Sequence, residues 1–328
     1  MTASHRAGLL LLVIGLFTLL TLSGNLPTVP TDRKNPPEEQ KQPFLVVLGI
    51  TQDAGYPQAG CRKDCCAIGW NDHAKQRDPC CAAVVDPKSG KRWLFDCTPS
   101  FPRQLQALDR LAPTSRAPGI AGIFLTHAHV GHYTGLIHLG REAMGARLVP
   151  VHVMPRMAQF LKSNGPWSLL VKLRNVELQP MTEGKAIPLT PDLSVTPLLV
   201  PHRGEYSETV GFRIQGPRHS VLYLPDIDRW SDWGTKIEDV LAQVDRAYLD
   251  GTFYSGKELP GRDVSLIPHP SIVTSMNHFS RLPERERNKV HFFHLNHTNP
   301  ALNPASDASR TIRKNGFHVA EQGERFGL

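Results

Sequence analysis

The sequence predicts an α/β fold of the sandwich type. Apolar, strand-like runs recur along the chain from residue 44 onward, and helix-like runs stand between only some of them. The stretch at residues 87–90 (Pro-Lys-Ser-Gly) is a turn signal between two strand-like runs, which indicates a hairpin. Strands and helices mixed with hairpins favour a sandwich over a simple doubly wound sheet.

The expected elements follow in chain order. Strand-like runs cover residues 44–50, 82–86, 92–97, 119–126, 193–200, 219–224, 246–250 and 290–293. Helix-like runs cover residues 102–111, 133–144, 155–163 and 235–244. No second linker and no internal repeat of short period interrupts this pattern, so we expect residues 43–328 to form one domain.

The first 42 residues predict export. His5 and Arg6 precede an apolar run of about fifteen residues, which is short for a membrane span but fits the core of a secretory signal. We therefore expect residues 1–24 to be a signal peptide or an N-terminal anchor. Residues 25–42 are rich in Pro, Thr and charge and are predicted to be a flexible linker. The protein would then be periplasmic, or anchored in the membrane and facing the periplasm.

The composition is that of an ordinary globular protein, with 40% hydrophobic and 20% charged residues. A chain of 328 residues can bury a core without disulfide or metal staples. The formal net charge of +7 comes from scattered Lys and Arg rather than basic runs, so we expect no nucleic-acid partner. The expected partner is a small-molecule substrate, with membrane contact only through an uncleaved N-terminal segment.

Three histidines, His127, His129 and His132, stand between a strand-like and a helix-like run. A strand that ends in an H-x-H-x-x-H loop can aim three imidazoles at one point. Neutral imidazole is the commonest biological metal ligand. The triplet therefore predicts a metal site.

Further metal-binding residue types stand where later strands are expected to end. They are His202, Asp226 and His294, with His297 close behind. Residues at strand ends can converge on one edge of a sandwich. A carboxylate placed between two cations can bridge them, and imidazoles can fill the remaining positions.

The order and spacing of these residues resemble the metallo-β-lactamase fold superfamily, whose signature is H-x-H-x-D-H followed by a distant His, a distant Asp and a last His. The resemblance covers residue 44 to about residue 327 and implies an αββα sandwich with one or two metal ions, zinc in the first place, at one edge. It implies a first metal position at His127, His129 and His202. It implies a second position at His132 and His294 with Asp226 bridging, and His297 as an alternative to His294.

The chain departs from this signature at Gly131, where the usual residue is Asp. Three explanations remain open. The second position can be weak, which makes the protein mononuclear. Another carboxylate, Asp53 or Asp228, can reach in. Or the chemistry can differ from ordinary hydrolysis.

A narrower resemblance is to the pyrroloquinoline quinone synthesis protein B (PqqB) family. It rests on residues 49–61, with Ala-Gly-Tyr-Pro-Gln at 54–58, and on residues 133–136, 250–253 and 294–300. The match is to a PqqB-like branch rather than to PqqB itself. The histidine triplet and the region of Asp226, which are degraded in PqqB, are largely intact here.

Other residues are candidates for the active site. His269 lies in a loop from which related metallo-hydrolases donate a proton, and a loop histidine without a role is the alternative. Asp250 could orient a metal-bound histidine. A polar stretch after His202 is predicted to line the substrate mouth, and a solvated loop is the alternative. Its members are Arg203, Glu205, Tyr206, Ser207 and Glu208.

Five of the six cysteines are grouped at residues 61–81. The group consists of Cys61, Cys65, Cys66, Cys80 and Cys81. The first three, with Cys80 or Cys81, could hold a structural zinc, and the resemblance to the PqqB family, which has a zinc-binding cysteine cluster, favours this. Disulfides are the alternative in an exported protein. Cys97 fits a buried free thiol.

The leading functional prediction is a metal-dependent hydrolase that attacks an ester, lactone or phosphodiester-type bond with metal-bound hydroxide. Bound zinc lowers the pKa of water from about 15.7 to about 7 and polarises the bond under attack. Asp226 would orient the water, and His269 would protonate the leaving group.

Two other functions remain open. One is a PqqB-like, iron-dependent oxygenase or oxidoreductase linked to quinone cofactor biosynthesis, because an altered ligand set at Gly131 can leave open positions. The other is a non-catalytic exported binding or carrier protein, because a fold alone does not prove catalysis.

Overall fold

The computed structural model describes residues 42–115, 117–259, 261, 263 and 267–328. The predicted signal peptide or anchor, and the predicted linker up to residue 41, lie outside the described residues. No helix in the described part of the chain is both long enough and apolar enough to cross a membrane.

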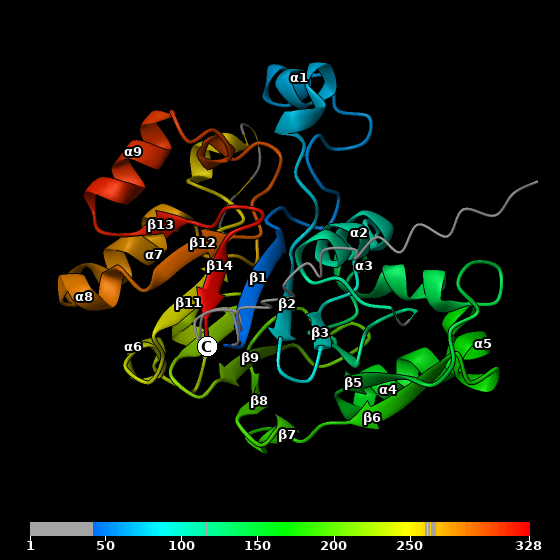
Figure 1. Cartoon of the computed structure of the whole chain (residues 1–328). Helices are drawn as coiled ribbons and strands as arrows, with labels where there is room; N and C mark the ends of the chain where they lie inside the picture. Colours follow the sequence, from blue (N-terminus) through cyan, green and yellow to red (C-terminus); the bar gives the residue numbers. More distant parts are fainter. Residues whose placement is uncertain (1–41, 116, 260, 262, 264–266) are drawn as a thin grey trace, which may run out of the picture. The chain divides into compact units, whose positions relative to one another are not determined.

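Two seven-stranded mixed sheets form the centre of the fold (Figure 1). The first runs in the order β14 (Arg325–Gly327), β1 (Phe44–Gly49), β2 (Cys81–Asp86), β3 (Lys91–Phe95), β4 (Gly122–Phe124), β5 (Val149–Val153) and β6 (Val176–Pro180). The second runs in the order β13 (His318–Val319), β12 (Val290–Phe293), β11 (Arg246–Asp250), β10 (Ser220–Leu224), β9 (Val210–Gln215), β8 (Leu193–Leu199) and β7 (Ile187–Thr190). The expected hairpin is confirmed, because β2 and β3 pair antiparallel across the turn at residues 87–90.

Helices flank both sheets. Those packed on the first sheet are α2 (Phe101–Leu111), α3 (Val130–Tyr133), α4 (Pro155–Ser163) and α5 (Trp167–Lys172). Those on the second are α6 (Ile237–Leu241), α7 (Ile272–His278) and α9 (Asp307–Lys314). The short α8 (Glu284–Arg287), which has no buried residue, precedes β12, and α1 (Asp64–Asn71) precedes β2. Short 3-10 helices are η2 (His73–Lys75), η3 (Thr134–Leu139), η4 (Trp230–Asp232), η5 (Gly256–Glu258), η7 (Phe279–Arg281) and η8 (Pro300–Leu302).

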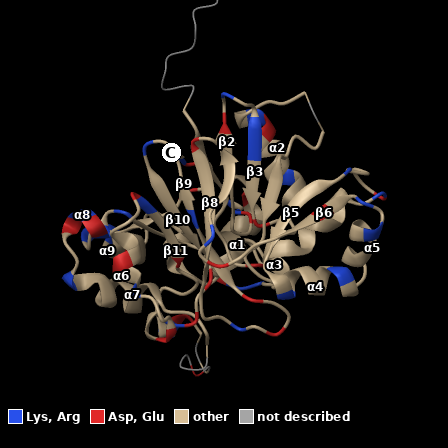
Figure 2. Cartoon of the chain, turned by 90° about the horizontal axis from the view of Figure 1, so that it is seen from below, with Lys and Arg blue, Asp and Glu red and all other residues tan. Residues whose placement is uncertain are grey.

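The core has three apolar layers, which is what an αββα sandwich requires. The middle layer lies between the sheets, where Phe95 and Phe124 of the first sheet meet Phe212 and Tyr223 of the second. The outer layers join each sheet to its helices. The predicted fold class is therefore confirmed. Figure 2 shows Lys and Arg dispersed over helices and loops and mixed with Asp and Glu.

The helix expected over residues 133–144 is wrong in its extent. The chain instead forms the single turn of α3 and then η3, which ends at Leu139. The tight turn brings Gly135 so close to the preceding loop that a Cβ there would lie 2.1 Å from the carbonyl oxygen of Thr98. This compact turn contains His132 and places it close to the residues that follow the strands.

Candidate metal centre

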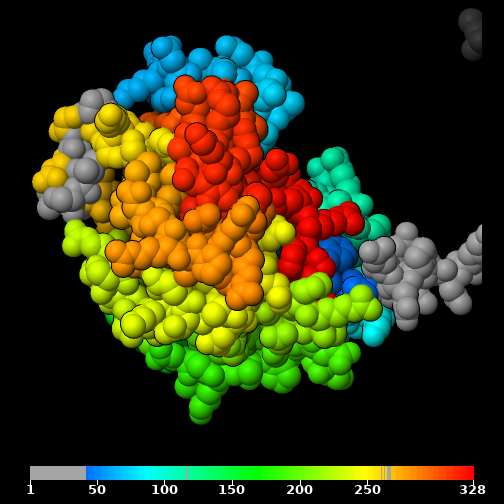
Figure 3. Space-filling model, turned by 90° about the vertical axis from the view of Figure 1, so that its left-hand side faces the viewer, coloured from blue at the N-terminus to red at the C-terminus, as the bar shows by residue number. Residues whose placement is uncertain are grey.

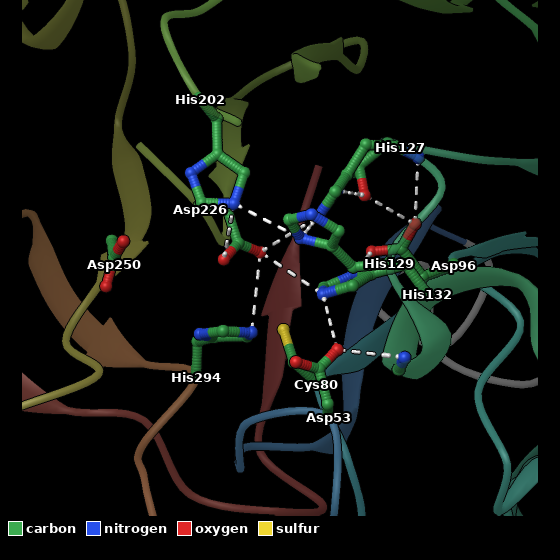
Figure 4. Close-up of polar contacts among 12 residues, drawn as sticks. Asp53, Cys80, Asp96, His127, His129, His132, His202, Asp226, Asp250 and His294 are labelled. Carbon is green, nitrogen blue, oxygen red and sulfur yellow. Dashed lines mark hydrogen bonds and ion pairs between the residues drawn. The ribbon is translucent and has the colours of Figure 1, made fainter. Parts of the chain in front are cut away.

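Side chains that follow several different strands converge at one place (Figure 4). His127 and His129 follow β4, and His132 lies in α3 directly after them. His202 follows β8, Asp226 follows β10 and His294 follows β12. We call these six residues the histidine centre. The structure thus brings together the residues that the sequence grouped as metal ligands, with the exception of His297.

Three imidazoles form the first position of the histidine centre. The His129 Nδ1 atom lies 2.8 Å from His127 Nε2 and 3.3 Å from His202 Nε2. The His127 and His202 side chains are buried, and that of His129 is 17% exposed. Three ring nitrogens this close, with an open side toward solvent, suit one tetrahedral cation whose fourth position stays available.

The second position surrounds the Asp226 carboxylate. Its Oδ2 atom lies 3.2 Å from His132 Nε2 and 3.4 Å from His294 Nε2. All three atoms are buried, yet none has a hydrogen-bond partner among the described residues. Leaving buried polar atoms unpaired costs about 1–3 kcal/mol each. A cation between them would satisfy all three, so these residues fit a metal.

Four of the imidazoles are held from behind through their Nδ1 atoms. The partners are Thr126 Oγ1 for His127 (3.0 Å), Asp96 Oδ2 for His132 (2.8 Å), Asp228 Oδ1 for His202 (2.8 Å) and Thr252 Oγ1 for His294 (2.9 Å). The two threonine hydroxyls donate to carboxylates, Thr126 to Asp96 and Thr252 to Asp250. Each hydroxyl oxygen must therefore accept from its histidine, which leaves every Nε2 with a lone pair for a metal.

Asp96 was missed by the sequence reasoning. It follows β3 with a φ of 66°, and it accepts hydrogen bonds from the Thr126 amide, the Thr126 hydroxyl and the Tyr223 hydroxyl as well as from His132. A non-glycine residue at positive φ costs energy and persists where the surroundings over-determine it. A lone Asp after an apolar strand was the only available signal. Asp250, which the sequence did suggest, accepts from Thr252 and from the Ile227 amide.

Burial sets the charge state of this centre. It holds the pKa of His127 and His294 well below the ordinary value, and it lowers that of His202 to about 2. These rings are neutral at pH 7, as metal ligands must be. Burial also acts downward on the pKa of His132, but Asp96 and Asp226 outweigh it and the net shift is upward.

His269 stands beside the metal centre. Its Nδ1 atom lies 2.7 Å from Asp250 Oδ2 and 3.8 Å from Asp226 Oδ1. Burial alone would lower the pKa of His269, but the Asp250 carboxylate raises it and the net shift is upward. The ring therefore holds a proton more firmly than a free imidazole does, which suits the predicted proton donor.

A cavity of about 600 Å³ opens next to His269. Its wall is mainly apolar and comes from the loops after β10 and β11, with Trp230, Phe253, Leu259, Ile267 and Pro270 among the lining residues. A mainly apolar pocket with a few polar groups beside perturbed titratable residues is the usual form of a small-molecule site.

The stretch predicted to line the substrate mouth divides in the structure. Glu205 lies at the centre, with its Oε2 atom 3.3 Å from His129 Nε2. Arg203 is exposed, and Tyr206 is 61% exposed with its ring against Phe160. The prediction that Glu208 lines the substrate mouth is wrong. Its carboxylate accepts hydrogen bonds from the Arg156 and Met157 amides and caps the first turn of α4.

A second group, which we call the cysteine cluster, consists of Cys61, Cys65, Cys66 and His297. His297 Nδ1 lies 3.3 Å from Cys66 Sγ and 3.7 Å from Cys65 Sγ, and the Cys61 and Cys65 sulfurs are 3.9 Å apart. Four such ligands have the composition of a structural zinc site. Burial raises the pKa of Cys66 to about 12, so the thiol must lose its proton when it binds a metal.

Two assignments from the sequence are therefore wrong. His297 does not join the histidine centre, because the chain turns at Leu295, which pairs with Ile50 and Gln52, and carries His297 toward α1. Cys80 and Cys81 do not join the cysteine cluster. Both are buried at the start of β2, with Cys80 Sγ 3.4 Å from the Tyr223 hydroxyl. All six cysteines are free thiols, so the alternative of disulfides is not realised in the structure.

Comparison with known protein sequences finds relatives along most of the chain. The profile described as the beta-lactamase superfamily domain matches residues 91–324. Coenzyme PQQ synthesis protein B of Xanthomonas oryzae pv. oryzae is 28% identical over 308 residues, a match that covers 87% of this chain and 99% of that protein. The protein of the same name from a Methylobacterium species is 26% identical, with 85% of this chain and 97% of that protein covered.

Solved structures with the same fold include Zn²⁺-bound PqqB from Methylobacterium extorquens. It has a TM-score of 0.73 at 21% identity, covering 87% of this chain and 100% of that chain. A diphosphatase from the PhnP family has a TM-score of 0.63 at 23% identity, covering 88% and 97%. The short form of human tRNase Z has a TM-score of 0.54 at 14% identity, covering 87% and 99%. At these identities the likeness establishes the fold.

Proposed function

The chain belongs to the beta-lactamase superfamily, in the branch that resembles coenzyme PQQ synthesis protein B, and we propose that it is a metal-dependent hydrolase. One observation carries this proposal. The Nε2 atoms of His127 and His202 and the Nδ1 atom of His129 converge beside the Asp226 carboxylate. A carrier that binds no metal would not need three imidazoles that converge beside a buried carboxylate.

The chain's own residues divide the work. A bound divalent ion would lower the pKa of water to about 7 and polarise the oxygen under attack. Asp226 is placed to accept a hydrogen bond from the attacking water. His269, oriented by Asp250 and facing both Asp226 and the cavity, is placed to give a proton to the leaving group.

The cavity next to His269 favours one class of substrate. A phosphodiester carries a charge that favours cationic walls. Among the described residues the lining has one arginine, Arg229, and is otherwise mainly apolar, with Trp230, Phe253 and Ile267 offering surface to the body of a substrate. We therefore favour an ester or lactone with an apolar acyl or alcohol part. Export of the enzyme to the periplasm, predicted from residues 1–24, remains part of the proposal.

A second candidate is an oxygen-dependent oxidoreductase that uses iron. The names of the relatives support the part of this candidate that links it to quinone cofactor biosynthesis, because coenzyme PQQ synthesis protein B matches this chain over 99% of its own length. Imidazole and carboxylate ligands with an open position also suit non-haem iron. Metal identity and oxygen dependence distinguish the two candidates.

The test compares the wild-type full chain with a His127→Ala/His202→Ala variant. His219→Ala, which changes an exposed histidine outside the centre, is the matched control. We expect the wild type to turn over members of a panel of esters and lactones without a requirement for oxygen. We expect the double variant to lose this turnover and to lose metal, as measured by elemental analysis. Full metal and full turnover in the double variant would refute the proposal. Iron with strictly oxygen-dependent turnover would favour the second candidate.

A further inference from the structure

The space that a side chain at position 131 would fill is already taken. A Cβ built on Gly131 would lie 2.2 Å from Asp53 Oδ1 and 2.4 Å from Asp53 Cα. Neither distance is compatible with a side chain, so glycine is required as long as Asp53 keeps its place. Asp53 in this place and an aspartate at position 131 therefore exclude each other, because both would need the same space.

Asp53 points into the second position of the histidine centre (Figure 4). Its Oδ1 atom lies 3.6 Å from His132 Nε2, and donor atoms of Asp53, His132 and His294 lie within 4.8 Å of one another. The side chain is 21% exposed, so the carboxylate stands between the buried imidazoles and solvent.

The backbone fixes Asp53 in this place. The Gln52 amide donates to the Leu295 carbonyl at 2.9 Å, and the Leu295 amide donates to the Ile50 carbonyl at 2.8 Å. Leu295 directly follows His294, so the segments that carry the two ligands are hydrogen-bonded to each other. The Gly131 amide donates to Asp53 Oδ1 at 2.8 Å and sets the direction of the carboxylate.

We propose that Asp53 supplies the carboxylate ligand that position 131 lacks, which completes the second metal position from a different strand. The donors are then the His132 and His294 nitrogens with the carboxylates of Asp53 and bridging Asp226. Two nitrogens and two oxygens suit Zn²⁺, Mn²⁺ or Fe²⁺. This inference rests on the proposed function, because it presumes that the first position binds a metal.

The competing role for Asp53 is that of a cap on the Gly131 amide at the start of α3. The two roles differ in what they need from the side chain. A cap needs only an oxygen acceptor, which the amide of asparagine also provides. A metal ligand at this site needs the negative charge. Asp53→Asn therefore separates the roles.

The experiment measures metal binding by the full chain with zinc and with cobalt. Asp53→Asn is compared with Asp192→Asn, which changes an exposed carboxylate in the turn between β7 and β8. We expect Asp53→Asn to lose one equivalent of metal, or to bind it about 100-fold more weakly, with unchanged thermal unfolding and an unchanged thiolate–cobalt band from the cysteine cluster. Wild-type stoichiometry and affinity in Asp53→Asn would overturn the inference.

A second variant removes the side chain. Asp53→Ala lacks both the carboxylate and the acceptor for the Gly131 amide. We expect Asp53→Ala to lose the same equivalent of metal as Asp53→Asn, and a folded Asp53→Ala that keeps the wild-type stoichiometry and affinity would contradict the inference. Absence of metal from the first position in the wild type would instead refute the proposed function, so the two failures are distinguishable.

Discussion

The histidine centre and the cysteine cluster share one stretch of chain, which follows β12 and supplies His294 to the first and His297 to the second, yet they are built in opposite ways. Behind the imidazoles stand carboxylates and hydroxyls, and a cavity opens beside them. Behind the Cys61 and Cys66 sulfurs lie backbone amides, those of Lys63 and Gln58. Ligands that are hydrogen-bonded to carboxylates and lie beside an open cavity are typical of a catalytic metal site. A site with four protein ligands and no open position is typical of a structural metal.

The cysteine cluster also has little apolar core around it. In Figure 3 the blue segment that carries α1 lies against the orange-red segment that follows β12, at the surface. Only Cys66 and Gly69 of α1 are buried, while Ile68 is 56% and Trp70 is 49% exposed. A segment that buries so little cannot offset its own conformational entropy. We therefore expect a metal to hold this segment, while the sandwich core holds the histidine centre.

The largest expected effect is on local stability in Cys66→Ser. Loss of the metal should release the α1 segment, because structural zinc sites contribute folding free energy outright. We expect limited trypsin cleavage after Arg62 or Lys63 to accelerate by about 100-fold or more, which corresponds to about 2.7 kcal/mol of local stability.

The histidine centre provides the contrast for this measurement. His127→Ala should leave the rate of cleavage after Lys63 unchanged, because the sandwich and not the metal holds that ligand. Equal acceleration in both variants would show that the two sites form one structural unit. No acceleration in Cys66→Ser would show that the α1 segment is stable without metal.

An intermediate effect is expected when the support of His294 is removed. In Thr252→Val the hydroxyl that accepts from His294 Nδ1 is replaced by a methyl group of similar size. We expect metal affinity at the second position to fall by about 10-fold to 100-fold, as loss of a hydrogen bond behind a ligand typically causes. Competition with a chelator of known affinity measures it.

The cysteine cluster is the internal reference for this variant. Its thiolate–cobalt band should not change in Thr252→Val, and the exposed Thr182→Val should change neither site. An unchanged affinity at the second position would mean that packing alone orients His294. A joint loss of both sites would break the distinction between them.

The sequence predicted most of the histidine centre because its ligands follow apolar strands, and strands are local features. β11 and β12 were predicted with the bounds that the structure has, so Asp250 and His294 were placed correctly at their ends. The partition of His294 from His297 could not be predicted. It depends on a turn at Leu295, which is fixed by hydrogen bonds to residues about 240 positions earlier in the chain.

Long-range contacts also explain the other misses. Cys80 and Cys81 are near Cys66 in sequence, but β2 carries them into the core between and beneath the sheets. Asp53 and Asp228 were the two candidates for the missing carboxylate in the sequence. The structure distinguishes them, because Asp53 lies next to Gly131 whereas Asp228 supports His202. Residue type identified these side chains, but only the packing of the strands decided which of them meet.

The smallest expected effect concerns a buried histidine that belongs to neither metal site. His152 of β5 stacks on Phe124 with ring centroids 4.2 Å apart, and burial lowers its pKa to about 4. Between that value and the unfolded value of 6.5, the unfolded chain binds a proton that the folded protein does not. Stability that depends on His152 is therefore present above pH 6.5 and is lost as the pH falls toward 4.

We expect His152→Gln to remove about 1 kcal/mol of the stability difference between pH 7 and pH 5, after allowance for the partial exposure of the ring. Urea unfolding of wild type and variant at both pH values gives this difference, with the exposed His219→Gln as the control. An equal pH dependence in wild type and His152→Gln would contradict the shift. Below pH 6.5, burial of the uncharged His152 ring therefore lowers the free energy of unfolding. The histidine centre buries several such rings around Asp226 at the same kind of energetic cost. We therefore expect a bound cation, rather than packing, to account for their burial.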